Sequence, residues 1–155
     1  MLTIDIPGRD PISLQHLILD YNGTIALDGA LIEGIAPRLQ QLAQQLSVHI
    51  ITADTHGTAK DRCSGLPAEV LTFPTVAVGE IKAQQARALS GGVVCIGNGF
   101  NDIQMSDACD LSIAVMGTEG CCCALLQHTD IAVTSILDAL DLLLKPARLR
   151  ATLRT

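Results

Sequence analysis

The residues best suited to chemistry fall into four short groups that lie far apart in the sequence. In the first, residues 20–24 (Asp-Tyr-Asn-Gly-Thr), the carboxylate of Asp20 follows the apolar run 17–19. Such a run has no polar face and is typical of a strand buried on both sides. The other groups contain Thr52, Lys82 and the run 97–102 (Gly-Asn-Gly-Phe-Asn-Asp).

Together these side chains suit the transfer of a phosphoryl group. A carboxylate such as Asp20 can attack phosphorus and hold the group as an aspartyl phosphate. The Thr52 hydroxyl and the Lys82 ammonium can bind the equatorial oxygens, where negative charge spreads in the transition state. Oxygens from 97–102 can help to hold Mg²⁺, which prefers hard oxygen ligands. Taken singly, Asp20 would more often cap a turn, and Thr52 and Lys82 would more often be a satisfied hydroxyl and a solvated charge.

Alternating strands and helices must bring these groups together. Short apolar runs rich in branched residues alternate with segments of helical period, which predicts a parallel α/β sheet with helices on both faces. Ligands of such sheets bind at the carboxyl ends of the strands. The predicted strands lie near 15–20, 47–52, 69–73, 92–97, 111–115 and 130–133, and the predicted helices lie near 35–46, 55–63, 79–90, 101–108, 118–127 and 135–144.

The length predicts one compact domain over 1–155, with two smaller features. The pair Asp28-Gly29 between apolar residues indicates a hairpin, so a small β flap is expected over 25–33. The tail over 135–155 should end in a short amphipathic helix, because Leu149 and Leu153 have helical spacing.

Composition excludes several classes of partner. The net charge of −6 argues against nucleic acid and anionic membranes as partners, and the apolar runs are too short to cross a bilayer. Six cysteines without a C-x-x-C pair indicate reduced thiols in a cytoplasmic protein. The four histidines lack metal-ligand spacing, and only His56, close to Thr52, is a candidate substrate contact.

In order and spacing, the four groups resemble the four motifs of the haloacid dehalogenase-like (HAD) superfamily. The resemblance runs from about His16 to Leu144, and the part from Asn101 to Gly117 is similar to the hinge motif in the phosphorylation domain of P-type ATPases. It implies a three-layer Rossmann-like fold. The intervals 25–51 and 53–81 are too short for a cap domain or a pump's nucleotide-binding domain, so a capless protein is expected.

The resemblance also implies a role for each matched residue. Asp20 would be the nucleophile and a ligand of Mg²⁺, Thr52 would bind phosphate, and Lys82 would bridge phosphate and nucleophile. Thr24 and Asn101 would support the site. The remaining metal ligands would be the Asn22 carbonyl, Asn98 and Asp102, and Asn22, Gly23 and Ala53 would lie beside the substrate.

Two asparagines depart from the family pattern. Most HAD phosphatases carry an aspartate at the position of Asn22, where it serves as general acid and base, and an amide cannot do this. Asn98 replaces an aspartate that usually binds Mg²⁺, so weaker metal binding is expected. The sequence therefore predicts a slow Mg²⁺-dependent phosphatase or phosphotransferase that favours good leaving groups.

Other functions stay open on the sequence alone. The two asparagines also fit a catalytically weakened module that binds phosphate or a partner protein, or a subunit that is active only in a complex. The expected substrate is a phosphorylated small molecule or protein. A capless site is open, so a macromolecular substrate or the neighbouring subunit of a homo-oligomer would close it.

Overall fold

A computed structural model describes residues 1–54 and 57–155. Seven strands of this part of the chain form one sheet in the order β6-β5-β2-β7-β8-β9, with β1 antiparallel to the first half of β2 and all other pairs parallel. The strands are β1 (Leu2–Ile4), β2 (Ile12–Asp20), β5 (Ser47–Thr52), β6 (Glu69–Thr72), β7 (Gly92–Gly97), β8 (Leu111–Val115) and β9 (Ile131–Val133).

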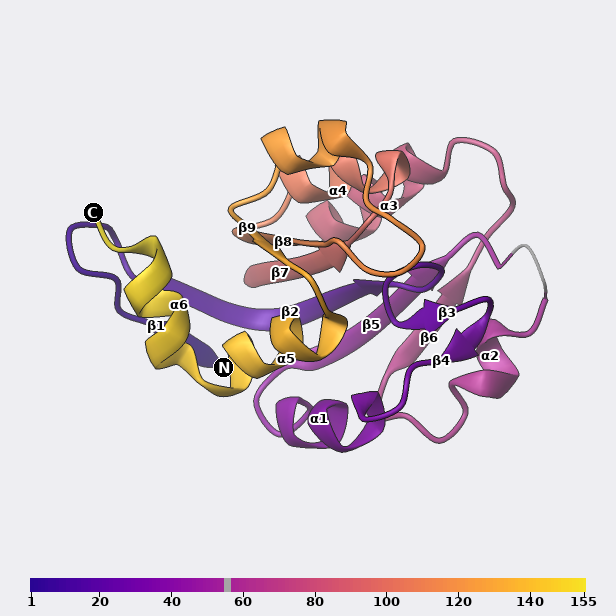
Figure 1. Cartoon of the computed structure of the whole chain (residues 1–155), viewed down its shortest axis with the longest axis horizontal. Coiled ribbons are helices and arrows are strands. Elements are labelled where there is room, and N and C mark those ends of the chain that lie inside the picture. Colours follow the sequence, from indigo (N-terminus) through magenta and orange to yellow (C-terminus); the bar gives the residue numbers. More distant parts are fainter. Residues whose placement is uncertain (55–56) are drawn as a thin grey trace.

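Helices cover both faces of this sheet, so the protein has three layers (Figure 1). One face carries α3 and α4, and the other carries α1, α5 and α6. The described helices are α1 (Ile35–Leu42), α2 (Ala59–Arg62), α3 (Val78–Ala88), α4 (Ile103–Asp107), α5 (Ile136–Leu144) and α6 (Pro146–Leu153), with 3₁₀ turns at Phe100–Asp102 and Cys123–Gln127.

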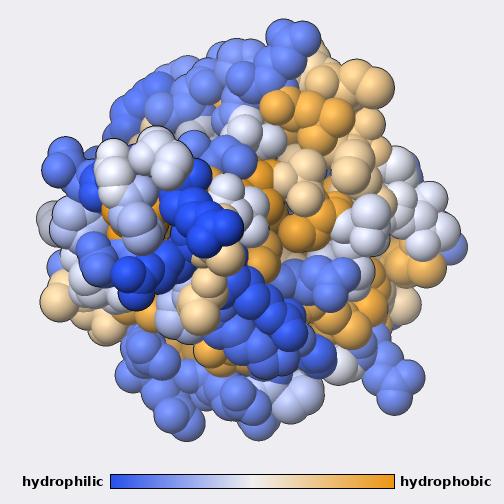
Figure 2. Space-filling model, turned by 60° about the vertical axis from the view of Figure 1, so that its left-hand side comes forward, coloured by the Kyte–Doolittle hydropathy of each residue, from blue (hydrophilic) through white to orange (hydrophobic). Residues whose placement is uncertain are grey.

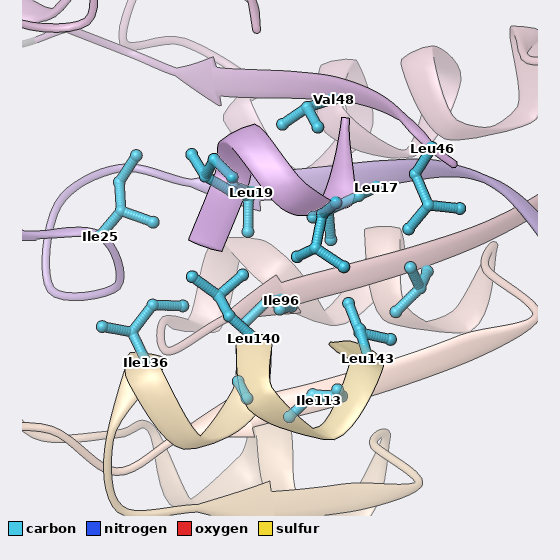
Figure 3. Close-up of a cluster of buried hydrophobic side chains, with 14 of the residues drawn as sticks. Leu17, Leu19, Ile25, Leu46, Val48, Ile96, Ile113, Ile136, Leu140 and Leu143 are labelled. Carbon is cyan, nitrogen blue, oxygen red and sulfur yellow. The ribbon is translucent and has the colours of Figure 1, made fainter. Parts of the chain in front are cut away.

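The central strand β2 contributes to both hydrophobic layers because its side chains alternate between the faces. Leu17 and Leu19 pack on the side of α5, where Leu140 and Leu143 meet them (Figure 3). Ile18 points to the opposite side and packs with residues of α3 and α4. This burial on both faces explains the continuous apolar run and holds Asp20 at the end of a rigid strand.

The predicted strands are all present, but several boundaries and one element differ from the prediction. The sequence analysis missed β1, which is short and pairs antiparallel at the amino end of β2. The helix predicted over 118–127 is wrong in its first half, because Gly117 and Gly120 form a tight turn there and only a 3₁₀ turn follows. The prediction over 55–63 lies partly outside the described residues, and α2 occupies 59–62.

The expected flap and tail are both present. The strands β3 (Ala26–Leu27) and β4 (Ala30–Leu31) form a hairpin directly after the Asp20 loop. The tail helix α6 lies beside β1 and buries Leu149. The surface at this end of the molecule has both hydrophilic and hydrophobic areas (Figure 2). No helix in the described residues is both long and apolar enough to span a membrane.

Candidate active site

The carboxyl ends of β2, β5 and β7 meet around one cavity of about 300 Å³. Each strand supplies the residue or loop that follows its last apolar side chain, and α3 contributes Lys82 from its first turns. The structure thus brings the four groups of the sequence analysis together. The cavity is lined by Asp20, Asn22, Thr52, Ala53, Lys82, Asn98, Gly99 and Asn101.

A buried ammonium group joins two carboxylates beneath this cavity. The Nζ atom of Lys82 donates to Asp20 Oδ1 at 2.5 Å and to Asp102 Oδ1 at 2.6 Å, and it lies 3.5 Å from Asn101 Oδ1. The Lys82 side chain is 1% exposed and that of Asp102 is fully buried. Such a lysine keeps its charge only because both carboxylates balance it, and it holds Asp20 in one orientation.

The same contacts shift the pKa values of both partners. Burial and, to a smaller extent, the nearby Asp102 carboxylate raise the pKa of Asp20 to about 6, and Lys82 opposes this rise. Burial alone would lower the pKa of Lys82, but the two carboxylates outweigh it and raise that pKa. The ammonium group is therefore charged at all physiological pH values, and Asp20 needs further positive charge nearby to stay fully ionised.

Asp102 uses its second oxygen to shape the loop after β7. Its Oδ2 accepts hydrogen bonds from the backbone N–H groups of Asn98 at 3.0 Å and Gly99 at 2.9 Å. Gly97 is required here because a Cβ atom would lie only 2.5 Å from Asp102 Cγ. Both Asp102 oxygens thus have protein donors, which makes it a support for Lys82 and for the loop.

Two oxygens with few protein contacts converge on the other side of Asp20. The Thr24 hydroxyl lies 3.2 Å from Asp20 Oδ2 and 3.1 Å from Asn98 Oδ1, and its single proton can serve only one of them fully. Asn22 lines the same cavity. The carboxylate oxygen of Asp20 and the amide oxygen of Asn98 are donors of the kind that suits a hard divalent cation.

The Thr52 hydroxyl is oriented by the backbone that follows it. The N–H group of Asp54 donates to Thr52 Oγ1 at 3.1 Å, so the hydroxyl proton remains free to donate into the cavity. Asp54 in turn accepts hydrogen bonds from the N–H groups of Thr58 and Ala59 and caps the start of α2. His56 lies outside the described residues.

A second, largely apolar cavity borders the first. It has a volume of about 530 Å³ and shares Asn101 with the first cavity. Ala77, Val78 and Ile103 contribute to its lining, and Phe100 lies on its rim with 73% of its surface exposed. A molecule held over Asp20 therefore has apolar surface available beside it.

Sequence reasoning missed one charged residue near the site. Glu119 follows β8, and its Oε1 accepts a hydrogen bond of 2.9 Å from the backbone N–H of Asp28 at the tip of the flap. Its Oε2 lies against Gly23 in the Asp20 loop. The signal available in the sequence was the pair of glycines at 117 and 120, which favours a turn over the start of a helix at 118.

Solved structures place the fold. The chain matches a cobalt-bound deoxy-D-mannose-octulosonate 8-phosphate phosphatase from Haemophilus influenzae with a TM-score of 0.71 and 16% identity, over 92% of this chain and 94% of that one. The chain has the capless HAD-like fold. A Moraxella catarrhalis enzyme of the same kind, solved with magnesium, phosphate and KDO, matches this HAD-like chain with a TM-score of 0.69 and 16% identity, over 89% and 90% of the two chains.

Other comparisons extend this picture. A zinc-transporting PIB-type ATPase matches with a TM-score of 0.64 and 23% identity, over 79% of this chain and 20% of the ATPase. The chain belongs to a family with two uncharacterised proteins of Methanocaldococcus jannaschii. One is 47% identical over 62 residues, which are 40% of this chain and 67% of that protein. The other is 46% identical over 39 residues, which are 25% of this chain and 89% of that protein. No family model matches the chain.

Proposed function

We propose that this protein is a Mg²⁺-dependent phosphatase or phosphotransferase that acts through an aspartyl phosphate on Asp20. The observation that carries the proposal is the Lys82 ammonium held between Asp20 and Asp102 at the floor of the cavity. Phosphatases of known structure with the same fold support it, and two of them were solved with cobalt or magnesium. We treat residues 1–155 as one catalytic domain.

In this mechanism a carboxylate oxygen of Asp20 attacks phosphorus, and the bond from phosphorus to the leaving oxygen breaks. Lys82 and Thr52 hold the equatorial oxygens of the phosphoryl group, with Ala53 beside it. Gly23, also expected beside the substrate, lines another cavity together with Thr24 and Glu119. Water then attacks the aspartyl phosphate, which releases phosphate and restores the Asp20 carboxylate.

Mg²⁺ would be held by Asp20, the Asn22 carbonyl and Asn98, and it would neutralise charge on the phosphoryl oxygens and keep Asp20 ionised. The converging oxygens of Asp20 and Asn98 beside Thr24 support this assignment. Asp102, the remaining ligand implied by the resemblance, is fully buried and does not line the cavity, so in this proposal it supports Lys82 and the loop after β7 instead of contacting the metal. Thr24 and Asn101 orient these groups.

The absence of a carboxylate at Asn22 sets the substrate preference. The leaving oxygen must depart without a proton from residue 22, so acyl and aryl phosphates should react far better than sugar phosphates. The apolar cavity beside Asn101 gives such leaving groups a surface to contact. Equal turnover of both classes would contradict this preference.

The phosphoenzyme itself provides the direct test. After mixing with acetyl phosphate and Mg²⁺, intact-mass spectrometry should detect a phosphorylated fraction in the wild-type protein and none in Asp20→Asn. A wild-type protein that shifts its melting temperature with Mg²⁺ and beryllofluoride but never becomes phosphorylated would instead favour the weakened binding module.

A second variant tests why hydrolysis should be slow. Asn22→Asp restores a group that can activate water, and general acid–base catalysis is typically worth roughly 10²–10⁴-fold. We expect the aspartyl phosphate of this variant to decay at least about 10²-fold faster in single-turnover experiments. An unchanged decay rate would show that residue 22 does not limit the second step. Deamidation of Asn22 or Asn98, each followed by glycine, should be checked by mass spectrometry in every preparation.

A further inference from the structure

Asn98 fixes the loop after β8 through its amide group. Its Nδ2 donates to the carbonyl oxygen of Gly120 at 3.1 Å, and its backbone carbonyl oxygen accepts from the N–H of Cys122 at 2.8 Å. An aspartate at this position could not donate the first of these hydrogen bonds. The asparagine thus gains a contact that orients the turn at 117–120.

That turn places a carboxylate beside Asn98. A Cβ atom built on Gly23 would clash with Asn98 Nδ2 and would meet Glu119 Oε2 at 2.8 Å, so the NH₂ side of the Asn98 amide and the Glu119 carboxylate lie against the same point of the Asp20 loop. Glu119 is also held at its other oxygen by the N–H of Asp28 in the flap. One hydrogen bond therefore positions this exposed carboxylate, and within the described residues it forms no ion pair.

The Glu119 carboxylate changes the net charge around the cation site. Asp20 and Asp102 carry two negative charges when ionised and Lys82 carries one positive charge, so the network has a net charge of −1. A divalent cation beside Asp20 would leave an excess of one positive charge. Glu119 removes this excess, and charge count tunes the affinity of such sites.

We propose that Glu119 supplies to the cation site the negative charge that the amide of Asn98 does not. The inference rests on the proposed function, because it assigns a residue to the same Mg²⁺ site. In this proposal the amide oxygen of Asn98 would bind the cation. The negative charge would come from Glu119 in the loop after β8, which the amide nitrogen of Asn98 holds through Gly120.

Binding of the metal alone tests this assignment. Mn²⁺ titrated into the full chain and followed by electron paramagnetic resonance should give a dissociation constant about 3- to 10-fold higher in Glu119→Gln than in the wild type. Glutamine keeps an oxygen that can accept from Asp28 and loses only the charge. Asp10→Asn removes the same charge before the amino end of β2, far from the site, and should change the constant less than about twofold.

A rescue variant separates charge from structure. In Asn98→Asp combined with Glu119→Gln, affinity for Mn²⁺ should return toward the wild-type value, because the charge is restored at position 98. Equal affinities in the wild type, Glu119→Gln and Asp10→Asn would overturn the assignment of Glu119 and leave the proposed function intact. Absence of Mn²⁺ binding by the folded wild type would overturn the metal site itself, and with it both proposals.

Discussion

Two hydrogen-bonded networks lie on the same face of β2, at the amino and carboxyl ends of the segment 16–20 that pairs with β5, and Ile18 separates them. At the carboxyl end Asp20 joins Lys82 and Asp102. At the amino end the ring of His16 lies 3.2 Å from that of His49, which lies 3.2 Å from a carboxylate oxygen of Glu69 on β6. The other nitrogen of His16 lies 3.2 Å from the carbonyl oxygen of Ser90.

The two networks differ in how they bear charge. At the carboxyl end a fixed positive charge is buried between two carboxylates, whereas at the amino end His49, whose pKa is lowered first by burial, is bonded to the exposed Glu69. A buried network of fixed charge holds the Asp20 carboxylate in one orientation, and in the proposed function a cation would complete its charge balance. The comparison therefore favours the carboxyl end of β2 as the place where the proposed metal and phosphoryl group would bind.

The networks should also respond to pH in opposite directions. The pKa of Asp20 is raised to about 6 in the metal-free fold, so its contribution to stability is present at low pH and is lost as the pH rises from about 4 to 6. The pKa of His49 is lowered, first by burial, so its contribution is present above about 6.5 and is lost as the pH falls.

Lys82→Met should break the first network with the largest effect. Methionine fills similar volume but leaves Asp20 and Asp102 facing each other without a counter-charge, a loss of about 3–5 kcal/mol when one partner of a buried ion pair is removed. Urea unfolding in EDTA should show this loss at pH 7.5 and a smaller loss at pH 5, where Asp20 takes up a proton. Mg²⁺ should restore part of the stability at pH 7.5.

The matched control for this variant is Lys60→Met on the exposed surface of α2, which should change the free energy of unfolding by less than about 0.5 kcal/mol. If Lys82→Met is as stable as the wild type at both pH values, the two carboxylates do not depend on Lys82, and the contrast between the ends of β2 fails.

Much of the fold is visible in the sequence because apolar runs and turn residues act locally. The run 17–19, the hairpin signal at Asp28-Gly29 and the helical spacing of Leu149 and Leu153 each predict their own element. The residues around Asp20 are found from their spacing, since β-strand ends in a parallel sheet meet at one edge.

The parts that escape prediction depend on contacts between distant segments. The position of His49 between His16 and Glu69 follows from the register of three strands, which no local pattern specifies. Glu119 lies in the segment 118–127, for which the sequence predicts a helix, and contacts of this segment with Asn98 and with Asp28 hold it as a turn beside the Asp20 loop. The position of Asp102 beside Lys82 likewise depends on a distant contact, because the Asp102 side chain packs against the backbone of Gly97 where no Cβ atom would fit.

His49→Gln should sharpen the comparison with the smallest effect. Glutamine can keep a hydrogen bond to Glu69 or His16 but cannot take up a proton, so the fall in stability of the wild type between pH 7.5 and 5.5 should become shallower. The difference in slope should amount to less than about 1 kcal/mol over this range, because Glu69, the partner of the buried His49, is 63% exposed and solvent screens the pair. The slopes should be measured by urea unfolding in saturating Mg²⁺. The cation keeps Asp20 ionised and so suppresses the opposite pH dependence that Asp20 would add. Identical slopes in both proteins would show that the amino-end network does not titrate in this range, and that the two ends of β2 differ only in burial.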